Sequence, residues 1–586
     1  MQQHGLSAYI VPGTDPHASE YMADHWKEIT WLSGFKGETG TVLATLTEAF
    51  LWTDSRYYLQ ADKELAGTGV SLMRESDIDT PTIPEWLTAN LQSGDKVGVN
   101  PEMFTVSGYK ALADQLSESG ISLKSIDFIR MLWTENRPPI PQVPLYEYKA
   151  EFAGETTQSK LTRVREELQK KKADTMVISA LDEIAWLLNI RGLDVDFNPV
   201  VISYLLLEQD NCTLFVDKTK VTAEAAEYLR KENITIKEYE DIFPALNALP
   251  VSATVLFDGN RLNRALYEAL PEQCRKIDVQ SPVMVLKSIK NEVELEGERI
   301  AMRQDAVALT RFFRWLEEEA FKGGNTPTEY DLMEKLHEYR AMGRNFVTES
   351  FGTIAGYKGN GAIVHYEATK DDCAVVHPEG MLLLDSGGQY LDGTTDITRT
   401  VWLGGEIPSQ AKLDFTYVLK GHIALASIHF PQGTRGNQLD ALAKQYMWQA
   451  GITFGHGTGH GVGHFLGCHE GPQNVRTDNN PTPLRVGNIC SDEPGIYRTG
   501  EWGVRIENLV AVKEAEQTEM RTTGDKFLCW ETLTLCYYDT SLIEMSLLTE
   551  QEKTWLNNYH ERVYNEISPM LTKDEAAWLR NKCKAI

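Results

Sequence analysis

The feature that most limits the possible folds is a pair of acidic residues placed symmetrically around a turn. The segment CSDEPGIYRTGEWGVRIENLVAV (490–512) is typical of a β-hairpin centred on Gly500. That centre places Glu493 directly opposite Glu507, and apolar neighbours predict that both strands are buried. Two like charges across a strand pair destabilise a sheet unless something positive lies between them. The chain therefore needs a fold that can hold a cation in its interior.

A second segment, MLLLDSGGQYLDGTTDITRTVWL (381–403), has the same arrangement. An apolar strand ends at Asp385, and a hairpin centred just after Tyr390 places that residue opposite Asp396. The alternative is a tighter turn at Asp392-Gly393, which would shift the pairing of the strands. With the first register, the two hairpins present four carboxylates among apolar side chains.

The stretch GHGTGHGVGHFLGCHEGP (455–472) supplies histidines that could join these carboxylates. His456, His460 and His464 are spaced four residues apart, and His469 follows them. A spacing of four suits one face of a helix, but each of the many glycines is less favourable in a helix than alanine by about 1 kcal/mol. We therefore predict extended or looping backbone for this stretch.

Four carboxylates with one or two imidazoles form a hard, oxygen-rich set of donors without thiolates. Such a set favours Mn²⁺, with Co²⁺ or Zn²⁺ as alternatives, over a structural zinc site. Four carboxylates also match the positive charges of two divalent ions, so we predict a dinuclear centre. In the competing interpretation, the carboxylates are solvated or paired with Arg399 and Arg505.

The first half of the chain contains a weak internal repeat. EITWLSGFKG (28–37) resembles EIAWLLNIRG (183–192), and the flanking segments agree in kind. Each copy predicts a strand, a short helix ending in glycine, two more strands and another helix. The proline-rich RPPIPQVPL (137–145) is a natural linker between the copies. We expect two successive α/β domains, at 1–137 and 138–286.

The region 287–515 predicts an α+β domain in which helices cover one face of an antiparallel sheet. A long helix begins after its cap Asn291, has Glu294 at the capping-box position, and ends at Gly323-Gly324. A second helix begins after Thr326, and strand-like segments follow it.

The remaining residues, 516–586, begin with aromatic, strand-like sequence and end in two helices. Capping boxes start at Thr549 and Thr572. The first of these helices carries an apolar stripe at helical spacing, composed of Leu556, Tyr559, Val563 and Ile567. Such a stripe is either a docking or dimerising surface or the core of its own domain.

The composition disfavours several classes of partner. The formal net charge of −27 disfavours nucleic acid and anionic membranes, since phosphates would meet like charge. The eight cysteines form no CxxC pair, which is typical of reduced thiols in a cytosol. The N-terminus lacks a basic segment followed by an apolar one, and no apolar run reaches the ~20 residues of a membrane helix. We therefore expect a cytoplasmic protein.

Six sequence blocks resemble the pita-bread metallopeptidase fold that methionine aminopeptidase, prolidase and aminopeptidase P share. They are AIVHYEA, LLLDSGGQY, GTTDITRTVWLG, GHGTGHGVGHFLGCHEGP, SDEPGIY and GVRIENL. The two α/β units resemble creatinase-type N-terminal domains, and the tail resembles the C-terminal extension of long, cytosolic-type aminopeptidase P. The family usually has a helix before the first strand, so the N-terminus here is expected to be trimmed or to start late.

The resemblance implies five metal ligands, each with the expected residue type: Asp385, Asp396, His460, Glu493 and Glu507. It also implies removal of the first residue from peptides whose second residue is proline, by a centre of two divalent ions, Mn²⁺ being expected first. A water that bridges the two metals would become hydroxide and attack the scissile carbonyl. Glu493 would pass the proton of that water to the leaving prolyl nitrogen.

Three further histidines match family positions that handle substrate. The resemblance implies that His365 and His469 hydrogen-bond the carbonyl or the tetrahedral intermediate, and that His456 lines the pocket for proline. His464 matches no such position, so we expect it to have no role in catalysis. Long family members suggest a homodimer formed through the C-terminal region.

Two other functions remain as alternatives. A prolidase, which cleaves Xaa-Pro dipeptides only, would use the same ligands, although the long form with its tail favours aminopeptidase P. A non-catalytic binding protein with this fold would be expected to lack ligands. Trp52, Tyr57 and Tyr58 could border a substrate cleft, although aromatic residues in that position are more typical of a core.

Overall fold

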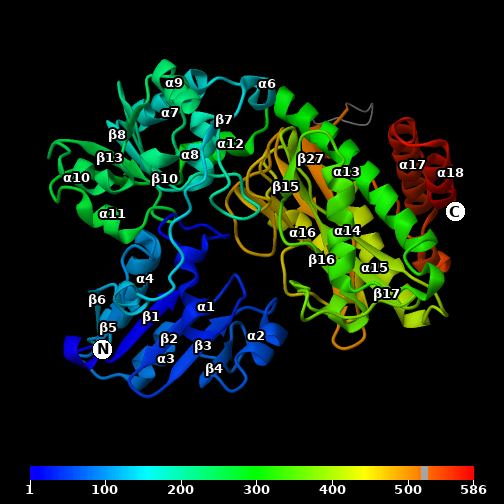
Figure 1. Cartoon of the computed structure of the whole chain (residues 1–586), viewed down its shortest axis with the longest axis horizontal. Coiled ribbons are helices and arrows are strands. Elements are labelled where there is room, and N and C mark those ends of the chain that lie inside the picture. Colours follow the sequence, from blue (N-terminus) through cyan, green and yellow to red (C-terminus); the bar gives the residue numbers. More distant parts are fainter. Residues whose placement is uncertain (517–524) are drawn as a thin grey trace. The chain divides into compact units, whose positions relative to one another are not determined.

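The computed structural model describes residues 1–516 and 525–586 (Figure 1). It contains two compact units, Met1–Met284 and Val285–Ile586. Residues 517–524, at the start of the predicted C-terminal extension, lie outside the described residues. Among the described helices, none is long and apolar enough to span a membrane.

The first unit contains two six-stranded sheets. The first consists of β1 (Ala8–Pro12), β2 (Thr41–Thr45), β3 (Ala49–Thr53), β4 (Val70–Arg74), β5 (Lys96–Val99) and β6 (Ser122–Ser125). The second consists of β8 (Thr175–Ile178), β10 (Ser203–Glu208), β11 (Cys212–Val216), β12 (Thr235–Lys237), β13 (Thr254–Phe257) and β14 (Arg275–Asp278).

The two sheets have the same topology. Their strand orders are β4-β3-β2-β1-β5-β6 and β12-β11-β10-β8-β13-β14. Corresponding neighbours also run in the same relative direction, because β1-β2 and β2-β3 are antiparallel, like β8-β10 and β10-β11, and the other pairs are parallel. The two related α/β folds expected from the internal repeat are therefore confirmed.

The repeated sequence forms the helix that follows the first strand of each sheet. These helices are α1 (Glu28–Ser33) and α8 (Leu181–Leu188). Helix α1 is followed by Gly34 in the left-handed conformation, whereas α8 is followed by Asn189 in that conformation. The expectation that both helices end at glycine is therefore wrong for α8, since asparagine also adopts this conformation.

Two helices open the second unit. Helix α13 (Glu292–Glu318) has the predicted cap at Asn291 and capping box with Glu294, but it ends before Gly323-Gly324. Helix α14 (Glu329–Ala341) is capped by Thr328 rather than by Thr326. The position of this cap was predicted wrongly because Thr328 has Asp331 three residues on, and the two side chains form a capping box.

Antiparallel strands form the rest of the second unit together with helices α15 (Ser409–Ala426) and α16 (Asn437–Gln449). Two small sheets have the orders β15-β18-β19 and β16-β17-β20, a larger one has the order β21-β28-β27-β24-β22-β23, and β25 pairs with β26. The bounds are β15 (Phe346–Glu349), β16 (Ile354–Tyr357), β17 (Met381–Ser386), β18 (Gly388–Tyr390), β19 (Gly393–Thr394), β20 (Ile397–Trp402), β21 (His429–Pro431), β22 (Gly459–Gly461), β23 (Glu470–Val475), β24 (Ile489–Asp492), β25 (Gly495–Arg498), β26 (Trp502–Arg505), β27 (Asn508–Glu514) and β28 (Phe527–Thr532).

The C-terminal helices α17 (Glu550–Ile567) and α18 (Lys573–Lys582), red in Figure 1, lie beside α13. Both begin at the predicted capping boxes, whose caps are Thr549 and Thr572. The apolar stripe of α17 is buried in the core of the second unit, where it joins residues of α13 and α15. The stripe is therefore core, and its side chains form no dimerising surface.

Candidate metal centre

The hairpin that carries the two aspartates has a different register from the predicted one. Asp385, in β17, lies opposite Thr398 of β20, so the prediction that it lies opposite Asp396 is wrong. Tyr390 pairs with Gly393, which leaves a turn of two residues at Leu391 and Asp392. Because side chains alternate with a period of two along a strand, this shift still leaves both aspartates on the same face.

The hairpin that carries the two glutamates has the predicted register. Asp492 pairs with Asn508 and Gly495 pairs with Arg505, so the hairpin is centred on Gly500. Glu493 and Glu507 lie between these two ladders. There the backbone N–H of Glu493 donates to the Thr458 carbonyl at 2.8 Å, and that of Glu507 donates to the Thr398 carbonyl at 3.1 Å.

The structure brings the predicted ligands together in one cluster, which we call the metal cluster: buried Asp385, Asp396 and Glu507, and half-buried His460 and Glu493. Donor atoms of Asp396, His460 and Glu507 lie within 4.8 Å of one another. The Nε2 atom of His460 is 3.4 Å from Asp396 Oδ2 and 3.4 Å from Glu493 Oε1. Asp385 lies close enough to Asp396 for the two charges to affect each other.

The charges of the metal cluster do not balance within the protein. Burial raises the pKa of Asp385, the pKa of Glu507, and the pKa of Glu493 to about 7. Burial also opposes ionisation of Asp396, but the hydrogen bond and charge of His460 lower its pKa below the ordinary value. Burial therefore opposes ionisation of three of the four carboxyl groups.

Two observations fit this cluster to divalent cations. Arg505 donates to Asp385 Oδ2 at 2.6 Å, but the buried Oδ1 atom accepts no hydrogen bond from any described residue. Nδ1 of His460 lies 3.0 Å from the Gly461 carbonyl, which places a ring proton there and leaves Nε2 as the nitrogen that faces the carboxylates and can bind a cation once it is deprotonated. Carboxylate oxygens with one imidazole are donors that Mn²⁺, Co²⁺ and Zn²⁺ accept.

Two of the other predicted site histidines lie beside the cluster. The ring of His469 packs edge-on against the ring of His460, with centroids 4.3 Å apart. His456 hydrogen-bonds the Tyr497 hydroxyl at 2.7 Å, and its Nδ1 atom is 3.9 Å from Glu493 Oε2. His365 lies in the half-buried loop that follows residues 358–362.

His464 belongs to a separate group of buried polar side chains, which we call the lysine cluster: Lys287, Lys290, Glu298, His464 and Glu470. Nδ1 of His464 is 3.1 Å from Glu298 Oε1, which also accepts the backbone N–H of Thr394 at 3.2 Å. Lys287 forms an ion pair with Glu470, and Lys290 donates to the Val462 carbonyl. The lysine cluster therefore contains its own positive charges.

Models of known protein families match nearly the whole chain. The model described as metallopeptidase family M24 matches residues 296–514, and models of the creatinase/prolidase N-terminal domain match 1–132 and 136–294. The model of the C-terminal region of peptidase M24 matches 526–586. A probable Xaa-Pro aminopeptidase P of Laccaria bicolor is 40% identical over 600 residues, which cover 100% of this chain and 92% of that protein. The chain belongs to metallopeptidase family M24.

Other members of family M24 are similar over nearly the whole length. Aminopeptidase P2 of Arabidopsis thaliana is 38% identical and covers 99% of this chain and 86% of that protein. The crystal structure of X-prolyl aminopeptidase from Caenorhabditis elegans, described as a cytosolic enzyme with a di-nuclear active site, has a TM-score of 0.93 at 35% identity and covers 99% and 95% of the two chains. The predicted fold class, creatinase-type domains followed by a pita-bread domain, is confirmed.

A more distant solved structure shares the fold alone. Xaa-Pro dipeptidase from Bacillus anthracis has a TM-score of 0.51 at 22% identity, and the match covers 65% of this chain and 98% of that one. This likeness concerns the fold and carries no statement about the length of the peptide that is cleaved.

Several residues that support the site in this M24 chain were not predicted. The Cys468 thiol donates to Asp396 Oδ2 at 3.2 Å. The Thr398 hydroxyl donates to Glu507 Oε2 at 2.8 Å. The alternative pairing of the carboxylates with arginine holds for Arg505 but not for Arg399, whose partners are oxygens of carbonyl, amide and phenol groups. The one signal of these roles in the sequence was that Cys468 lies within a block that resembles the family.

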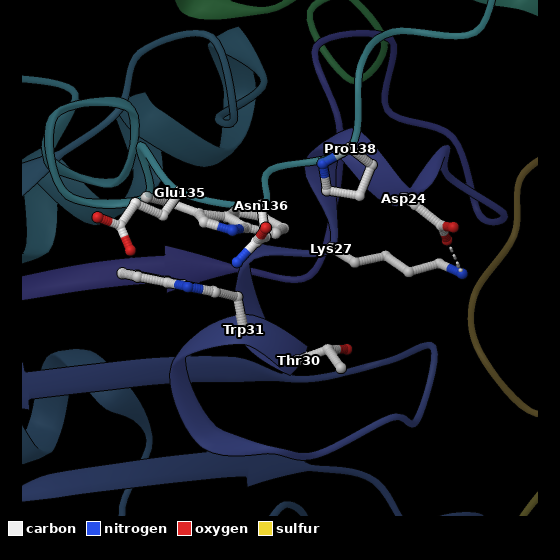
Figure 2. A pocket seen from close by; sticks show the side chains of 8 residues that line it. Asp24, Lys27, Thr30, Trp31, Glu135, Asn136 and Pro138 are labelled. Carbon is white, nitrogen blue, oxygen red and sulfur yellow. Dashed lines mark ion pairs between the residues drawn. The ribbon is translucent and has the colours of Figure 1, made fainter.

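A pocket of about 460 Å³ lies in the first unit (Figure 2). Trp31 forms one wall of it and stacks on Trp133, with ring centroids 5.4 Å apart. All the residues that line it belong to the first unit, whereas the metal cluster belongs to the second. Trp52 and Tyr57, considered above as a cleft border, are buried core residues.

Proposed function

We propose that this protein is a metal-dependent aminopeptidase that removes the first residue from peptides with proline at position 2. The observation that carries the proposal is the metal cluster itself, in which three buried carboxylates face a half-buried carboxylate and a half-buried imidazole. The proposal is also supported by similarity along the whole chain to proteins named Xaa-Pro or X-prolyl aminopeptidase.

We propose that the five residues of the metal cluster hold two divalent ions, and that these are Mn²⁺, with Co²⁺ or Zn²⁺ as the alternatives. The oxygen-rich donor set supports this choice, because Mn²⁺ prefers carboxylates to thiolates. When bound, such ions acidify a water and polarise the scissile carbonyl. The thiol of Cys468 is buried and its pKa is raised well above the ordinary value, so it serves as a hydrogen-bond donor and not as a thiolate ligand.

Glu493 is proposed to move the proton between the attacking water and the leaving prolyl nitrogen. A carboxylate placed beside the attacking water can accept its proton and release it again. The Ser491 hydroxyl donates to Glu493 Oε1 at 3.1 Å and holds that oxygen beside His460. The other oxygen of Glu493 faces His456.

Three histidines are proposed to handle the substrate. His365 and His469 would donate hydrogen bonds to the scissile carbonyl oxygen as its negative charge develops. His456 would line the pocket for proline, since its ring packs against Phe454 at 4.7 Å and its Nε2 atom is held by Tyr497. Phe454 and the ring of His456 thus form an apolar wall, and the ring nitrogens of His456 are its polar group.

The test compares an Xaa-Pro-Pro tripeptide with an Xaa-Pro dipeptide, with Mn²⁺, Co²⁺ and Zn²⁺ added separately to metal-stripped protein. We expect cleavage of the tripeptide and highest activity with Mn²⁺. Strong preference for the dipeptide would favour prolidase activity instead. Protein that retains less than one Mn²⁺ per chain and cleaves neither peptide would be a non-catalytic binding protein.

We also propose a cytoplasmic homodimer, as the resemblance to long aminopeptidase P suggests, and four domains at 1–137, 138–286, 287–515 and 516–586. Light scattering of the purified protein tests the dimer, since it should give twice the mass of one chain. Because the apolar stripe of α17 is core, contacts between copies would have to use other side chains of the C-terminal region.

A further inference from the structure

Arg399 is a buried cation whose partners surround the backbone of a proposed ligand. It lies in β20 and is only 2% exposed. Its guanidinium donates to the Glu507 carbonyl at 2.7 Å and to Asn508 Oδ1 at 2.8 Å. Because a guanidinium is planar and makes several hydrogen bonds at once, it holds these neighbours in a fixed geometry.

The C-terminal region supplies the other half of this arrangement. Arg399 also donates to the Cys536 carbonyl at 2.8 Å, to the Tyr537 carbonyl at 3.0 Å and to the Tyr559 hydroxyl at 3.1 Å. The ring of Tyr538 lies over the guanidinium, 4.4 Å from it. The segment after β28 therefore packs directly behind the strands that present the metal cluster.

A chain of hydrogen bonds continues from Asn508 through Tyr538. The Asn508 side-chain amide donates to the Tyr538 hydroxyl at 2.7 Å, and that hydroxyl lies 2.9 Å from His422 Nε2. Nδ1 of His422 faces two oxygens of Asp492, at 3.1 Å and 3.2 Å, so it carries the ring proton and Nε2 accepts from the hydroxyl. The chain thus runs from Arg399 to the backbone carbonyl of Asp492. The Asn508 amide also lies 3.1 Å from His422 Nε2, so these two residues are linked both directly and through the Tyr538 hydroxyl.

Two members of this chain, Asn508 and Asp492, are sequence neighbours of two proposed ligands. Asp492 and Asn508 are partners across β24 and β27, and they adjoin Glu493 and Glu507. Since successive side chains along a strand point to opposite faces, Asp492 and Asn508 point away from the metal cluster. The chain therefore links the two strands on the face behind the cluster, and all of its members are buried.

We propose that Tyr538 is a positioning residue for the metal centre, and that its hydroxyl sets the separation of Glu493 and Glu507 by closing this chain. The inference rests on the proposed metal site and gives the C-terminal region a role in it. Partners that orient metal ligands from outside typically change metal affinity or activity by 10–100-fold when they are lost. Loss of this hydroxyl should therefore weaken metal binding more than it weakens the fold.

The test is Tyr538→Phe, with Tyr537→Phe as the matched control. Both variants lose one phenolic hydroxyl from adjacent residues, but the ring of Tyr537 packs against Phe313 and Trp578 on the side of α13 and α18. Binding of Mn²⁺ to metal-stripped protein is measured by calorimetry, and unfolding without metal is measured by urea denaturation. We expect the Kd of Tyr538→Phe for Mn²⁺ to rise about tenfold and that of Tyr537→Phe to stay unchanged.

A second variant, His422→Gln, breaks the same chain from α15 and should also weaken Mn²⁺ binding, which separates the chain from mere packing of the tail. If Tyr538→Phe and Tyr537→Phe bind Mn²⁺ as the wild type does, the positioning role is wrong, whatever happens to their stability. If the wild type itself binds no Mn²⁺, the proposed function fails and this inference fails with it.

Discussion

The metal cluster and the lysine cluster both bury several acidic side chains in the second unit, but they balance the charge differently. In the metal cluster, the one guanidinium that donates to a carboxylate is that of Arg505, which holds Asp385. In the lysine cluster, Lys287 and Lys290 accompany Glu298 and Glu470. The lysine cluster contains lysines that offset the charge of its glutamates. In the metal cluster, the described side chains offset only part of the negative charge.

The two clusters also respond to burial in different ways. In the lysine cluster, burial raises the pKa of Glu298 well above its usual range and lowers the pKa of Lys290, so both groups move toward neutrality. In the metal cluster, burial and mutual repulsion raise the pKa of Glu507, and among the described residues the positive charge that opposes this shift is that of Arg505. A buried acidic cluster with its own bases is a structural site, and one without them indicates a cation site.

The largest expected effect is loss of activity in Glu493→Ala. The variant removes a proposed ligand and the proposed proton carrier together, so kcat/KM should fall by about 10²–10⁴-fold. His464→Ala, from the lysine cluster, should keep most of the kcat/KM of the folded protein. Kinetics with an Xaa-Pro-Pro tripeptide measure both, and equal loss in two folded variants would contradict the roles assigned here.

The second effect is on stability and concerns the lysine cluster. Glu298→Ala leaves the His464 ring and the Thr394 backbone N–H without their carboxylate in the interior, which should lower the free energy of unfolding by about 3 kcal/mol. Glu298→Gln keeps an acceptor for both and should lose less. Urea denaturation measures the change, and a larger loss in the glutamine variant would show that charge matters more than hydrogen bonding.

The third effect distinguishes the clusters by their response to metal. At a Mn²⁺ concentration of about 100 times Kd, the wild type should gain about 2.7 kcal/mol in its free energy of unfolding, because only the folded state binds the ion. Glu298→Gln should gain the same amount, whereas Glu507→Ala should gain less. Melting curves with Mn²⁺ and with a chelator provide the measurement, and an equal gain in Glu507→Ala would exclude that residue as a ligand.

The smallest effect is a change of stability with pH. In the metal-free protein the pKa of Glu493 is about 7, above its ordinary 4.5, so the folded state holds a proton that the unfolded state loses. The stability from this group is fully present below pH 4.5 and is lost as pH rises to about 7, at most about 1.4 kcal/mol for each pH unit. Saturating Mn²⁺ should reverse the trend, because protons then compete with the ion.

Urea denaturation at pH 5, 6 and 7 checks this prediction, with Glu493→Gln as the control. The control cannot bind that proton and should lack the decline seen in the metal-free wild type. An identical decline in both proteins would assign the titration to another group.

The four carboxylates of the metal cluster were recognisable because acidic residues recur in two apolar hairpins, whereas His460 was assigned from the resemblance. The register of the glutamate hairpin was also predictable, since its turn lies symmetrically about Gly500. The register of the aspartate hairpin was not. Its turn at Leu391 and Asp392 is held by Asn345, whose carbonyl accepts from Leu391 N–H and whose amide donates to Asp392.

Contacts between distant segments account for the other features that the sequence did not reveal. His464 lies in the same short stretch as His460, but its partner Glu298 belongs to α13, and no local spacing connects them. Arg399 was considered as a partner for carboxylates, and its actual partners lie partly in the C-terminal region. A pattern in sequence identifies which residues need a partner, and only the fold determines which partner they find.

The identical order and direction of strands in the two sheets of the first unit has an evolutionary consequence. Six strands that repeat both order and direction are the expected product of a duplicated gene segment whose copies then diverged. The copies still bury an equivalent glutamate, Glu28 in one and Glu183 in the other. The neighbouring tryptophan has diverged, because Trp31 is 39% exposed beside the pocket of Figure 2 whereas Trp186 is buried. The same position of the repeat thus faces solvent in one copy and the core in the other.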